Sequence, residues 1–297
     1  MKKITTLIFV LAFLNSCTTI KINDLVRDEL NGAVKSVKTT ANIVAAKEEE
    51  QSKFLVKEYV EYNTDGNRIE WTLHDVWKKE NSRNTFTYDE NGNLTERNLD
   101  VTVTIIYDVN EEIGEKADTL IETYRKQFGY SYDEKRNRVE ERAYDRFGRL
   151  GKKTIYTYNR KRNLIRKGEP LGNFITYAYN RKGKLIEERS SNADGSYVMR
   201  TTYKYDNKGY RIEMDVYNFD GSLLSKDIYT NDEKGNLIER TGYSSKGELS
   251  RRNIFTYDDK GNWIEEKEYK RQIEYKEPQN TYEVKIFRVI KREIEYY

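Results

Sequence analysis

The sequence predicts an all-β protein, an antiparallel meander of repeated β-hairpins that forms one elongated, twisted or coiled sheet. The first observation is a set of turn residues that recurs every 26 residues along much of the 297-residue chain. The second is composition: the chain has 25 tyrosines, and Tyr, Thr, Ile and Val favour strands, whereas its two prolines are few for a disordered linker. We expect roughly 18 strands, so an open sheet would be on the order of 80 Å long.

The turns form two alternating sets. A second set follows members of the first by 12 residues, a slip of five residues occurs near Gly168–Asn173, and an insertion lies between Asn93 and Tyr132. The first set ends at Gly66, Gly92, Arg136, Arg162, Gly183, Gly209, Gly235 and Gly261, and the second at Gly148, Gly195, Gly221 and Gly247.

The glycine turns are predicted to be two-residue type I′ loops, as at Asp65-Gly66 and Asn91-Gly92. Such a loop needs a positive φ angle at both central residues, and glycine adopts this angle without strain. Arg136 and Arg162 occupy the glycine position of two turns, which predicts backbone strain or a longer loop there.

A two-residue loop also fixes the register of the two strands that it joins. The fourth residue before the glycine then faces the third residue after it, so Tyr205 is expected to face Ile212 and to lie beside Tyr203. The same rule places three columns on one face of the sheet: Tyr62, Tyr88, Tyr132, Tyr158, Tyr179, Tyr205, Asn231 and Tyr257; Ile69, Thr95, Val139, Ile165, Ile186, Ile212, Ile238 and Ile264; and Val60, Phe86, Tyr130, Tyr156, Tyr177, Tyr203, Tyr229 and Phe255.

The opposite face carries mostly Glu, Lys, Arg and Thr, together with a second set of tyrosines. Sugar rings stack on exposed aromatic rings, so this set supplies the candidate ligand-facing residues Tyr144, Tyr217, Tyr243 and Tyr269. At the two ends of the array, Val34 to Ala45 and Phe54 to Tyr62 are expected to form a hairpin across Glu48–Glu50, and Tyr282 to Tyr296 a closing strand.

The N-terminus has the pattern of an export signal over residues 1–16. Met1-Lys2-Lys3 is followed by an apolar segment of 11 residues, Ile4 to Leu14, which is too short to span a bilayer. Leu14-Asn15-Ser16-Cys17 resembles the lipobox of bacterial lipoproteins. The resemblance implies a diacylglyceryl thioether on Cys17, signal cleavage and acylation of the new amine, which together would anchor the protein to a membrane.

The same resemblance implies sorting to the outer membrane of a Gram-negative host, because Thr18 stands where an aspartate would retain a lipoprotein in the inner membrane. We therefore expect a lipid-anchored cell-envelope protein. Its expected parts are a signal peptide (1–16), a lipid-anchored tether (17–32) and a repeat domain (33–297).

The recurring unit resembles the YD repeats of the Rhs family. It occurs as Phe86-Thr87-Tyr88-Asp89-Glu90-Asn91-Gly92-Asn93-Leu94 and again as Phe255-Thr256-Tyr257-Asp258-Asp259-Lys260-Gly261-Asn262-Trp263, and the similarity covers roughly Val56 to Tyr269. Large Rhs proteins wind such repeats into a shell around a C-terminal toxin. This chain differs from them in period and in size, and no distinct domain follows its repeats.

Neither catalysis nor a cofactor is expected. The one histidine, His74, lies in a strand-like segment and is expected to be packed or solvent-facing, while Cys17 is assigned to the lipid. No metal site is expected either, since Asn63, Asn159 and Asn180 occupy the position that holds an aspartate in other turns, which favours turn capping over calcium binding. The aspartates at that position are Asp89, Asp133, Asp206 and Asp258.

Charge is dense but nearly balanced, with 53 Lys and Arg against 50 Asp and Glu, which argues against nucleic acid as a partner. The expected function is non-enzymatic: a membrane-anchored envelope scaffold or interaction surface, with an unidentified glycan or protein as its partner. The alternative is a carbohydrate- or peptidoglycan-binding module that uses the tyrosine rows.

Overall fold

The computed structural model describes residues 28–43, 54–75, 79–107, 118–274 and 281–297. Within these ranges all regular secondary structure is β-strand. The expected all-β antiparallel meander and its 18 strands are confirmed. The strands are β1 Val34–Ile43, β2 Phe54–Tyr62, β3 Arg68–Asp75, β4 Glu80–Tyr88, β5 Leu94–Tyr107, β6 Asp118–Tyr132, β7 Arg138–Tyr144, β8 Leu150–Tyr158, β9 Leu164–Gly168, β10 Phe174–Tyr179, β11 Leu185–Ser191, β12 Tyr197–Tyr205, β13 Arg211–Asn218, β14 Leu223–Asn231, β15 Leu237–Ser244, β16 Leu249–Tyr257, β17 Trp263–Glu274 and β18 Thr281–Tyr296.

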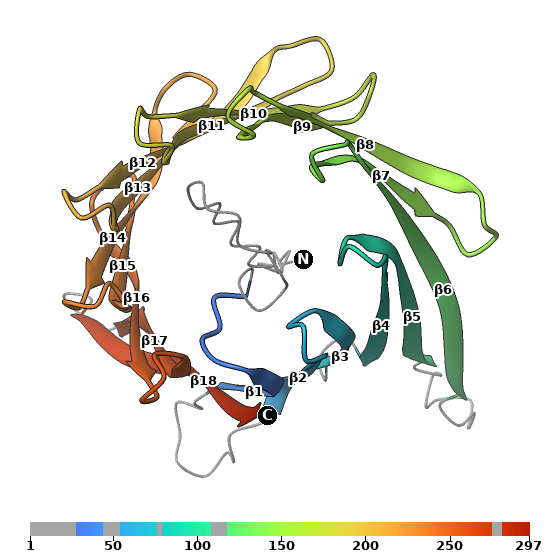
Figure 1. Cartoon of the computed structure of the whole chain (residues 1–297). Coiled ribbons are helices and arrows are strands. Elements are labelled where there is room, and N and C mark those ends of the chain that lie inside the picture. The colour runs from blue at the N-terminus through green and yellow to red at the C-terminus, as the bar shows by residue number, and fades with distance from the viewer. Residues whose placement is uncertain (1–27, 44–53, 76–78, 108–117, 275–280) are drawn as a thin grey trace.

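The sheet closes on itself to form a β-barrel, which corrects the expected elongated, twisted or coiled sheet (Figure 1). The first strand, β1, pairs with β2 on one side and with β18 on the other: Val37 lies opposite both Val60 and Ile294. In an open sheet, β1 and β18 would each expose a row of unpaired backbone N–H and C=O groups. Closure pairs these two rows with each other and leaves the sheet without an edge.

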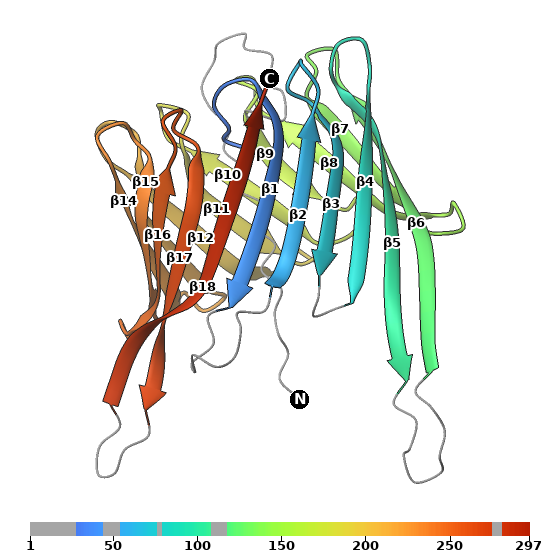
Figure 2. The same cartoon turned by 90° about the horizontal axis from the view of Figure 1, so that it is seen from below.

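Successive turns lie at opposite ends of the barrel, as in any up-and-down meander. Figure 2 shows the turns that join β2 to β3 and β4 to β5 at its upper end, which we call the upper rim. The upper rim carries the whole first set of turns, from Gly66 to Gly261, and the lower rim carries the second set. The interruptions in the period correspond to strand length: β9 and β10 have five and six residues, and β5 and β6 have 14 and 15.

The turns are three-residue loops, which corrects the predicted two-residue type I′ geometry. In the loop after Tyr205, the Asp206 N–H donates to the Tyr210 carbonyl (2.9 Å) and the Gly209 N–H donates to the Asp206 carbonyl (3.1 Å). Only Gly209 has a positive φ (90°), so the loop is a type I turn followed by a left-handed residue. The physical reason is that Lys208, which a type I′ loop would force to positive φ, avoids that strain in a type I turn.

Arg136 and Arg162 form the same three-residue loop at φ angles of 64° and 66°, so the predicted backbone strain at these two positions is confirmed. The Arg136 N–H donates to the Asp133 carbonyl and the Arg162 N–H to the Asn159 carbonyl, each at 2.9 Å, as glycine does elsewhere.

The extra loop residue shifts the register by one and is followed by a β-bulge. Tyr205 lies opposite Arg211, and Lys204 lies opposite Glu213, so Ile212 is the unpaired residue of the bulge. The predicted pairing of Tyr205 with Ile212 is therefore wrong, and Ile212 is 39% exposed. Three other members of the predicted isoleucine column are also exposed: Ile69, Ile186 and Ile238.

Both ends of the array follow the expected plan. The antiparallel pairing of β1 with β2 and the closing strand β18 are confirmed, whereas the expected loop Glu48–Glu50 lies outside the described residues. The described part of the expected tether lies inside the ring (blue in Figure 1), where Leu30 packs in a buried cluster with Val34, Val37, Val60 and Tyr62. The main-chain N–H of Asn31 donates to Asn262 Oδ1 (2.6 Å) on the last turn of the upper rim. Residues 28–31 are thereby fixed to the upper rim next to the β1–β18 seam.

Candidate interaction surfaces

The tyrosine columns line the inside of the barrel. Tyr62 donates a hydrogen bond from its hydroxyl to Asp28, which also pairs with Arg68, and residues 28–33 lie within the ring (Figure 1). Side chains two residues apart on a strand share a face, so Val60 and the equivalent residues of other strands also point inward. Barrels of about this strand number enclose a channel rather than a side-chain core. The lumenal wall is therefore the lining of a channel, and the tyrosines are the main aromatic residues of this lining.

The tyrosines nearest the upper rim form a ladder of hydrogen bonds between neighbouring hairpins. The Tyr205 hydroxyl donates to the main-chain carbonyl of Leu185 (2.7 Å), which is the second residue after the glycine of the preceding upper-rim turn. At the position where asparagine replaces tyrosine, Asn231 Nδ2 donates to the carbonyl of Arg211 (3.0 Å) in the same way. The other members are Tyr132 to Leu94, Tyr158 to Arg138, Tyr179 to Leu164 and Tyr257 to Leu237, at 2.8 to 2.9 Å.

A second lumenal row, two residues further from the rim, combines tyrosine with carboxylate and guanidinium groups. The hydroxyls of Tyr156 and Tyr203 donate to Glu141 and Glu188, both at 2.9 Å. The Arg211 guanidinium lies 4.6 Å from the ring centre of Tyr203, a cation–π distance. These arginines were not singled out from the sequence, although they share a position in the repeat that could have identified them. Like Arg211, Arg68 and Arg138 are each the second residue after the turn residue, and each of these two is stacked on an aromatic ring.

Burial shifts the ionisation of these phenols. Burial, reinforced by the negative charge of Glu188, raises the pKa of Tyr177 and of Tyr179 to about 12.

Further around the lumen, Asp227 is nearly fully buried and accepts hydrogen bonds from Arg240 (2.6 Å) and Arg251 (3.0 Å). The lumenal face is thus polar, and its most deeply buried carboxylate, Asp227, is paired with two guanidinium groups.

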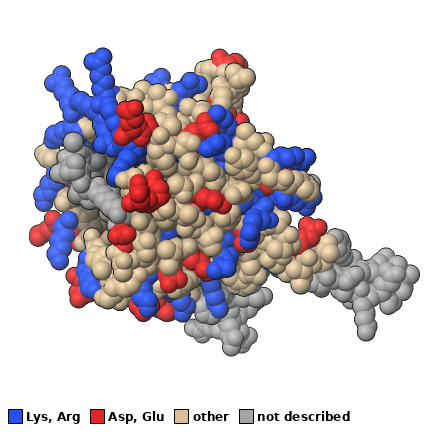
Figure 3. Space-filling model, turned by 45° about the vertical axis from the view of Figure 1, so that its right-hand side comes forward, with Lys and Arg blue, Asp and Glu red and all other residues tan. Residues whose placement is uncertain are grey.

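The outer face carries ion pairs between neighbouring strands around most of the barrel. Examples are Arg83 with Glu70 (2.6 Å) between β4 and β3, and Arg252 with Glu239 (2.8 Å) between β16 and β15. These side chains lie along the middle of the strands, and Figure 3 shows both signs of charge over the face turned toward the viewer. Other pairs of this kind are Lys38–Glu293, Arg125–Asp100, Lys153–Glu140, Lys204–Glu213, Lys226–Asp215 and Lys291–Glu265.

The four candidate ligand-facing tyrosines lie on the outer face and are all half-buried. The structure brings three of them, Tyr217, Tyr243 and Tyr269, onto the alternate strands β13, β15 and β17, whereas Tyr144 is far from them on β7. Across each strand pair, these three tyrosines lie opposite Arg200, Lys226 and Arg252. The Arg200 guanidinium stacks on Tyr217 at 4.5 Å, so one face of that ring is already covered.

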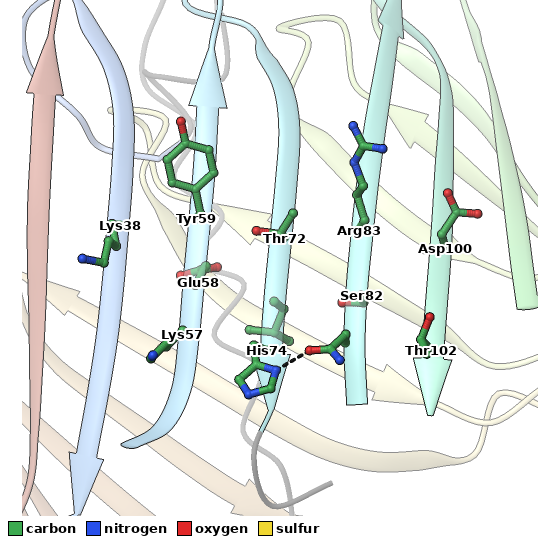
Figure 4. A pocket seen from close by; sticks show the side chains of 12 residues that line it. Lys38, Lys57, Glu58, Tyr59, Thr72, His74, Ser82, Arg83, Asp100 and Thr102 are labelled. Atoms are coloured by element: carbon green, nitrogen blue, oxygen red, sulfur yellow. Dashed lines mark hydrogen bonds between the residues drawn. The ribbon is translucent and has the colours of Figure 1, made fainter. Parts of the chain in front are cut away.

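His74 is exposed on the outer face of β3, as expected for a structural histidine, and its Nδ1 is hydrogen-bonded to Asn81 (Figure 4). It borders an open depression of about 550 Å³, which is also lined by Lys38, Tyr59 and Arg83. Figure 4 shows these side chains standing side by side on neighbouring strands rather than converging on one point. The partner of His74 is an amide, so it does not form the carboxylate-oriented imidazole of a catalytic triad.

The turn aspartates cap their own loops, which confirms the capping prediction. Asp89 Oδ1 accepts hydrogen bonds from the main-chain N–H groups of Asn91 (3.0 Å) and Asn93 (2.8 Å), and Asn63 Oδ1 does the same for residues 65 and 67. The Asn93 amide and main-chain N–H hold the pKa of Asp89 below its usual range. Within the described residues, no cluster of three or more His, Cys, Asp or Glu side chains could hold a metal ion.

The signal peptide and Cys17 lie outside the described residues, and so does most of the expected tether. In the part of the chain that the structure describes, no helix has the length and hydropathy needed to cross a membrane.

Comparison with known proteins gives similarity to solved structures only. No family model and no curated protein matches the chain. A porin-like protein from Bacteroides uniformis aligns with 89% of this chain and 99% of its own, at 11% identity and a TM-score of 0.46. The Photorhabdus luminescens Tc holotoxin pore aligns with 77% of this chain but only 15% of its own, at 14% identity and a TM-score of 0.32. Similarities this low do not support a functional argument.

The tyrosine ladder predicts which side chains hold neighbouring hairpins together. Tyr205→Ala should lower the free energy of unfolding by about 2 kcal/mol, roughly half the cost of truncating a fully buried aromatic ring. Tyr205→Phe should cost about 1 kcal/mol, because it removes only the hydrogen bond to Leu185. Lys208→Ala, in the adjacent turn, should cost less than about 0.5 kcal/mol. Urea unfolding of the three variants measures this order, and equal small shifts for all three would refute the ladder.

The raised tyrosine pKa values predict that stability falls at alkaline pH. Unfolded tyrosines lose their protons near pH 10, whereas Tyr177 and Tyr179 keep theirs to about 12 in the folded state. Their contribution is fully present below about pH 10 and is lost as the pH rises through about 12. Urea unfolding at a series of pH values, with phenolate absorbance recorded in parallel, tests this. Replacing both residues with Phe should flatten the pH dependence, and an unchanged slope in that variant would contradict the assignment.

Proposed function

We propose that this protein is a lipid-anchored envelope protein whose barrel stands in water and serves as a non-catalytic scaffold or interaction surface. The observation that carries the proposal is the outer face. A barrel that sits in lipid presents an apolar band roughly 25 Å tall. Here that position carries inter-strand ion pairs such as Arg83–Glu70 and Arg252–Glu239. Each arginine or lysine placed in lipid at mid-height would cost about 2 to 4 kcal/mol, so water is the favoured surrounding for this wall.

The lipid anchor is the second element of the proposal, and it rests on the sequence around Cys17. Several acyl chains would hold the protein at a membrane without help from the barrel. The outer membrane is the proposed location, from Thr18 after the cysteine. What supports a non-catalytic role is the arrangement of the polar groups: the phenols are bonded to carbonyls or carboxylates, and many of the carboxylates are paired with cations.

The proposal is tested by separating the anchor from the barrel. The wild-type protein should fractionate with membranes and partition into the detergent phase of a non-ionic detergent. The chain from residue 18 onward should remain in the aqueous phase, because its outer wall carries ion pairs such as Arg83–Glu70 and Arg252–Glu239 where a lipid-facing wall is apolar. Full-length Cys17→Ser, which keeps the signal peptide, should incorporate no radiolabelled palmitate. Detergent-phase partitioning of the chain from residue 18 would instead indicate a barrel that inserts into lipid.

A second candidate is binding of a carbohydrate or of peptidoglycan on the outer face. It is favoured by the row in which Tyr243 and Tyr269 are two strands, roughly 10 Å, apart and each lies opposite a cation. Co-sedimentation of the chain from residue 18 with insoluble peptidoglycan tests it. Tyr243→Ala with Tyr269→Ala should weaken binding, and Tyr144→Ala, on the distant strand β7, is the matched control. Equal binding by both variants would remove this candidate.

A further inference from the structure

The upper rim is electrically divided into two arcs. The three adjacent turns 133–137, 159–163 and 180–184 contain eight cationic and two acidic residues. The other five upper-rim turns (63–67, 89–93, 206–210, 232–236 and 258–262) contain three cationic and eight acidic residues. We call the first group the basic arc; its cations are Lys135, Arg136, Arg160, Lys161, Arg162, Arg181, Lys182 and Lys184.

The basic arc keeps a large net positive charge, because its eight cations far outnumber its two acidic residues. Among the described residues, none of its eight cations forms an ion pair with a carboxylate, whereas many cations on the outer wall do. The side chains at 160–162 and at 181–182 are exposed. Uncompensated charge of one sign at one end of a barrel raises the local potential and attracts partners of the opposite sign.

Two arginines of the basic arc have a strained backbone conformation. Arg136 and Arg162 adopt positive φ angles at the position that holds glycine in the six other upper-rim turns of the repeat. Their guanidinium groups reach sideways along the rim: Arg136 donates to Asn91 Oδ1 (2.6 Å), and Arg162 donates to the carbonyl of Lys135 (2.7 Å). These bonds are exposed, so they compensate the strain only weakly. Strained residues cluster at functional sites, which agrees with a binding role for this arc.

We propose that the basic arc binds the anionic lipid headgroups of the membrane to which the protein is anchored. Successive turns of the arc are about 10 Å apart along the rim, so their cations form a broad surface rather than a pocket for one ion. A broad basic surface fits a membrane that displays many phosphates. The other five upper-rim turns, with their eight acidic residues, would be repelled from the same membrane, which sets the orientation of the barrel on the membrane.

Residues 28–31 lie at the same rim as the basic arc, although beside the acidic turns 63–67 and 258–262, and this part of the argument rests on the proposed lipid at Cys17. Asp28 is fixed at the upper rim through Tyr62 and Arg68. The 11 residue-to-residue steps from Cys17 to Asp28 span at most about 40 Å when fully extended. The anchor can therefore reach a membrane that touches the upper rim. A lipid anchor together with a basic surface is a pairing that gives stable membrane attachment.

The lower rim offers the competing contact, through apolar residues at the tips of its turns. Phe147, Leu171 and Phe219 are 66%, 96% and 66% exposed. These tips would favour a membrane irrespective of its charge, whereas the basic arc requires anionic lipid and is weakened by salt. Lipid charge, salt and point variants therefore distinguish the two rims.

The test is co-sedimentation of the chain from residue 18, which has no lipid, with vesicles of phosphatidylglycerol and phosphatidylcholine or of phosphatidylcholine alone. We expect binding only to the anionic vesicles, and release by high salt. Lys161→Gln with Lys182→Gln should weaken binding about 25-fold, about fivefold for each cation. Arg146→Gln with Lys246→Gln removes the same charge from lower-rim turns and should leave binding unchanged.

Arg136→Gly with Arg162→Gly gives an independent measurement. This variant should unfold at the same or a higher urea concentration than wild type, and yet bind anionic vesicles at least tenfold more weakly. A merely structural role for the two arginines predicts a lower urea midpoint and unchanged binding, and that result would refute the strain argument.

Three other results would overturn the proposal: equal binding to neutral vesicles, equal weakening in the lower-rim control, or loss of binding in Phe147→Ser with Leu171→Ser. Binding to soluble acidic polysaccharide with no binding to anionic vesicles would also overturn it and identify a glycan partner. None of these results depends on Cys17, so failure here is distinguishable from failure of the lipid-anchor proposal, which palmitate labelling reports.

Discussion

The pairing of β1 with β18 is the interaction on which the rest of the structure depends. It joins Ser36–Ile43 to Glu295–Arg288, residues about 250 positions apart, by the same antiparallel register that each hairpin forms locally. Without it the sheet would have two free edges and no inside. The seam is also the best-packed part of the molecule: Val34 and Tyr62 are among its most buried residues, and Leu30 of the entering chain covers them.

Closure makes the two faces of one sheet into two different surfaces. The inner surface has the tyrosine ladder, in which each ring near the upper rim bonds to the hairpin before it, and it contains the most deeply buried ion pairs, such as Asp227 with Arg240. The outer surface has exposed ion pairs, which individually contribute little to stability but keep the wall wettable. The rims differ from both walls: the upper rim carries the cations of the basic arc, which form no ion pair with a described carboxylate, and the lower rim carries apolar side chains at the tips of its turns.

The sequence predicted the local elements well because their causes are local. Turn residues at a fixed spacing gave the strands, and alternation placed Tyr203 and Tyr205 on one face, as the structure has them. Register was missed by one residue at Ile212, because an apolar side chain in an alternating pattern does not reveal a bulge. Closure could not be decided from the sequence, because it depends on two strands at opposite ends of the chain. The candidate tyrosines were placed on their own face, but their spacing, with Tyr144 distant from the rest, depends on the strand order in three dimensions.

Closure of the barrel is the central claim, and a cross-link across the seam tests it most directly. Lys38 and Glu293 lie opposite each other on the outer face of β1 and β18, with 2.9 Å between Nζ and Oε2. In the chain from residue 18, which has no cysteine of its own, Lys38→Cys with Glu293→Cys should form an intramolecular disulfide on mild oxidation, because opposed antiparallel residues have Cα atoms about 4.5 to 5.5 Å apart. In an open sheet the two residues would be at opposite edges. Two free thiols, or disulfides only between molecules, would contradict the closed barrel.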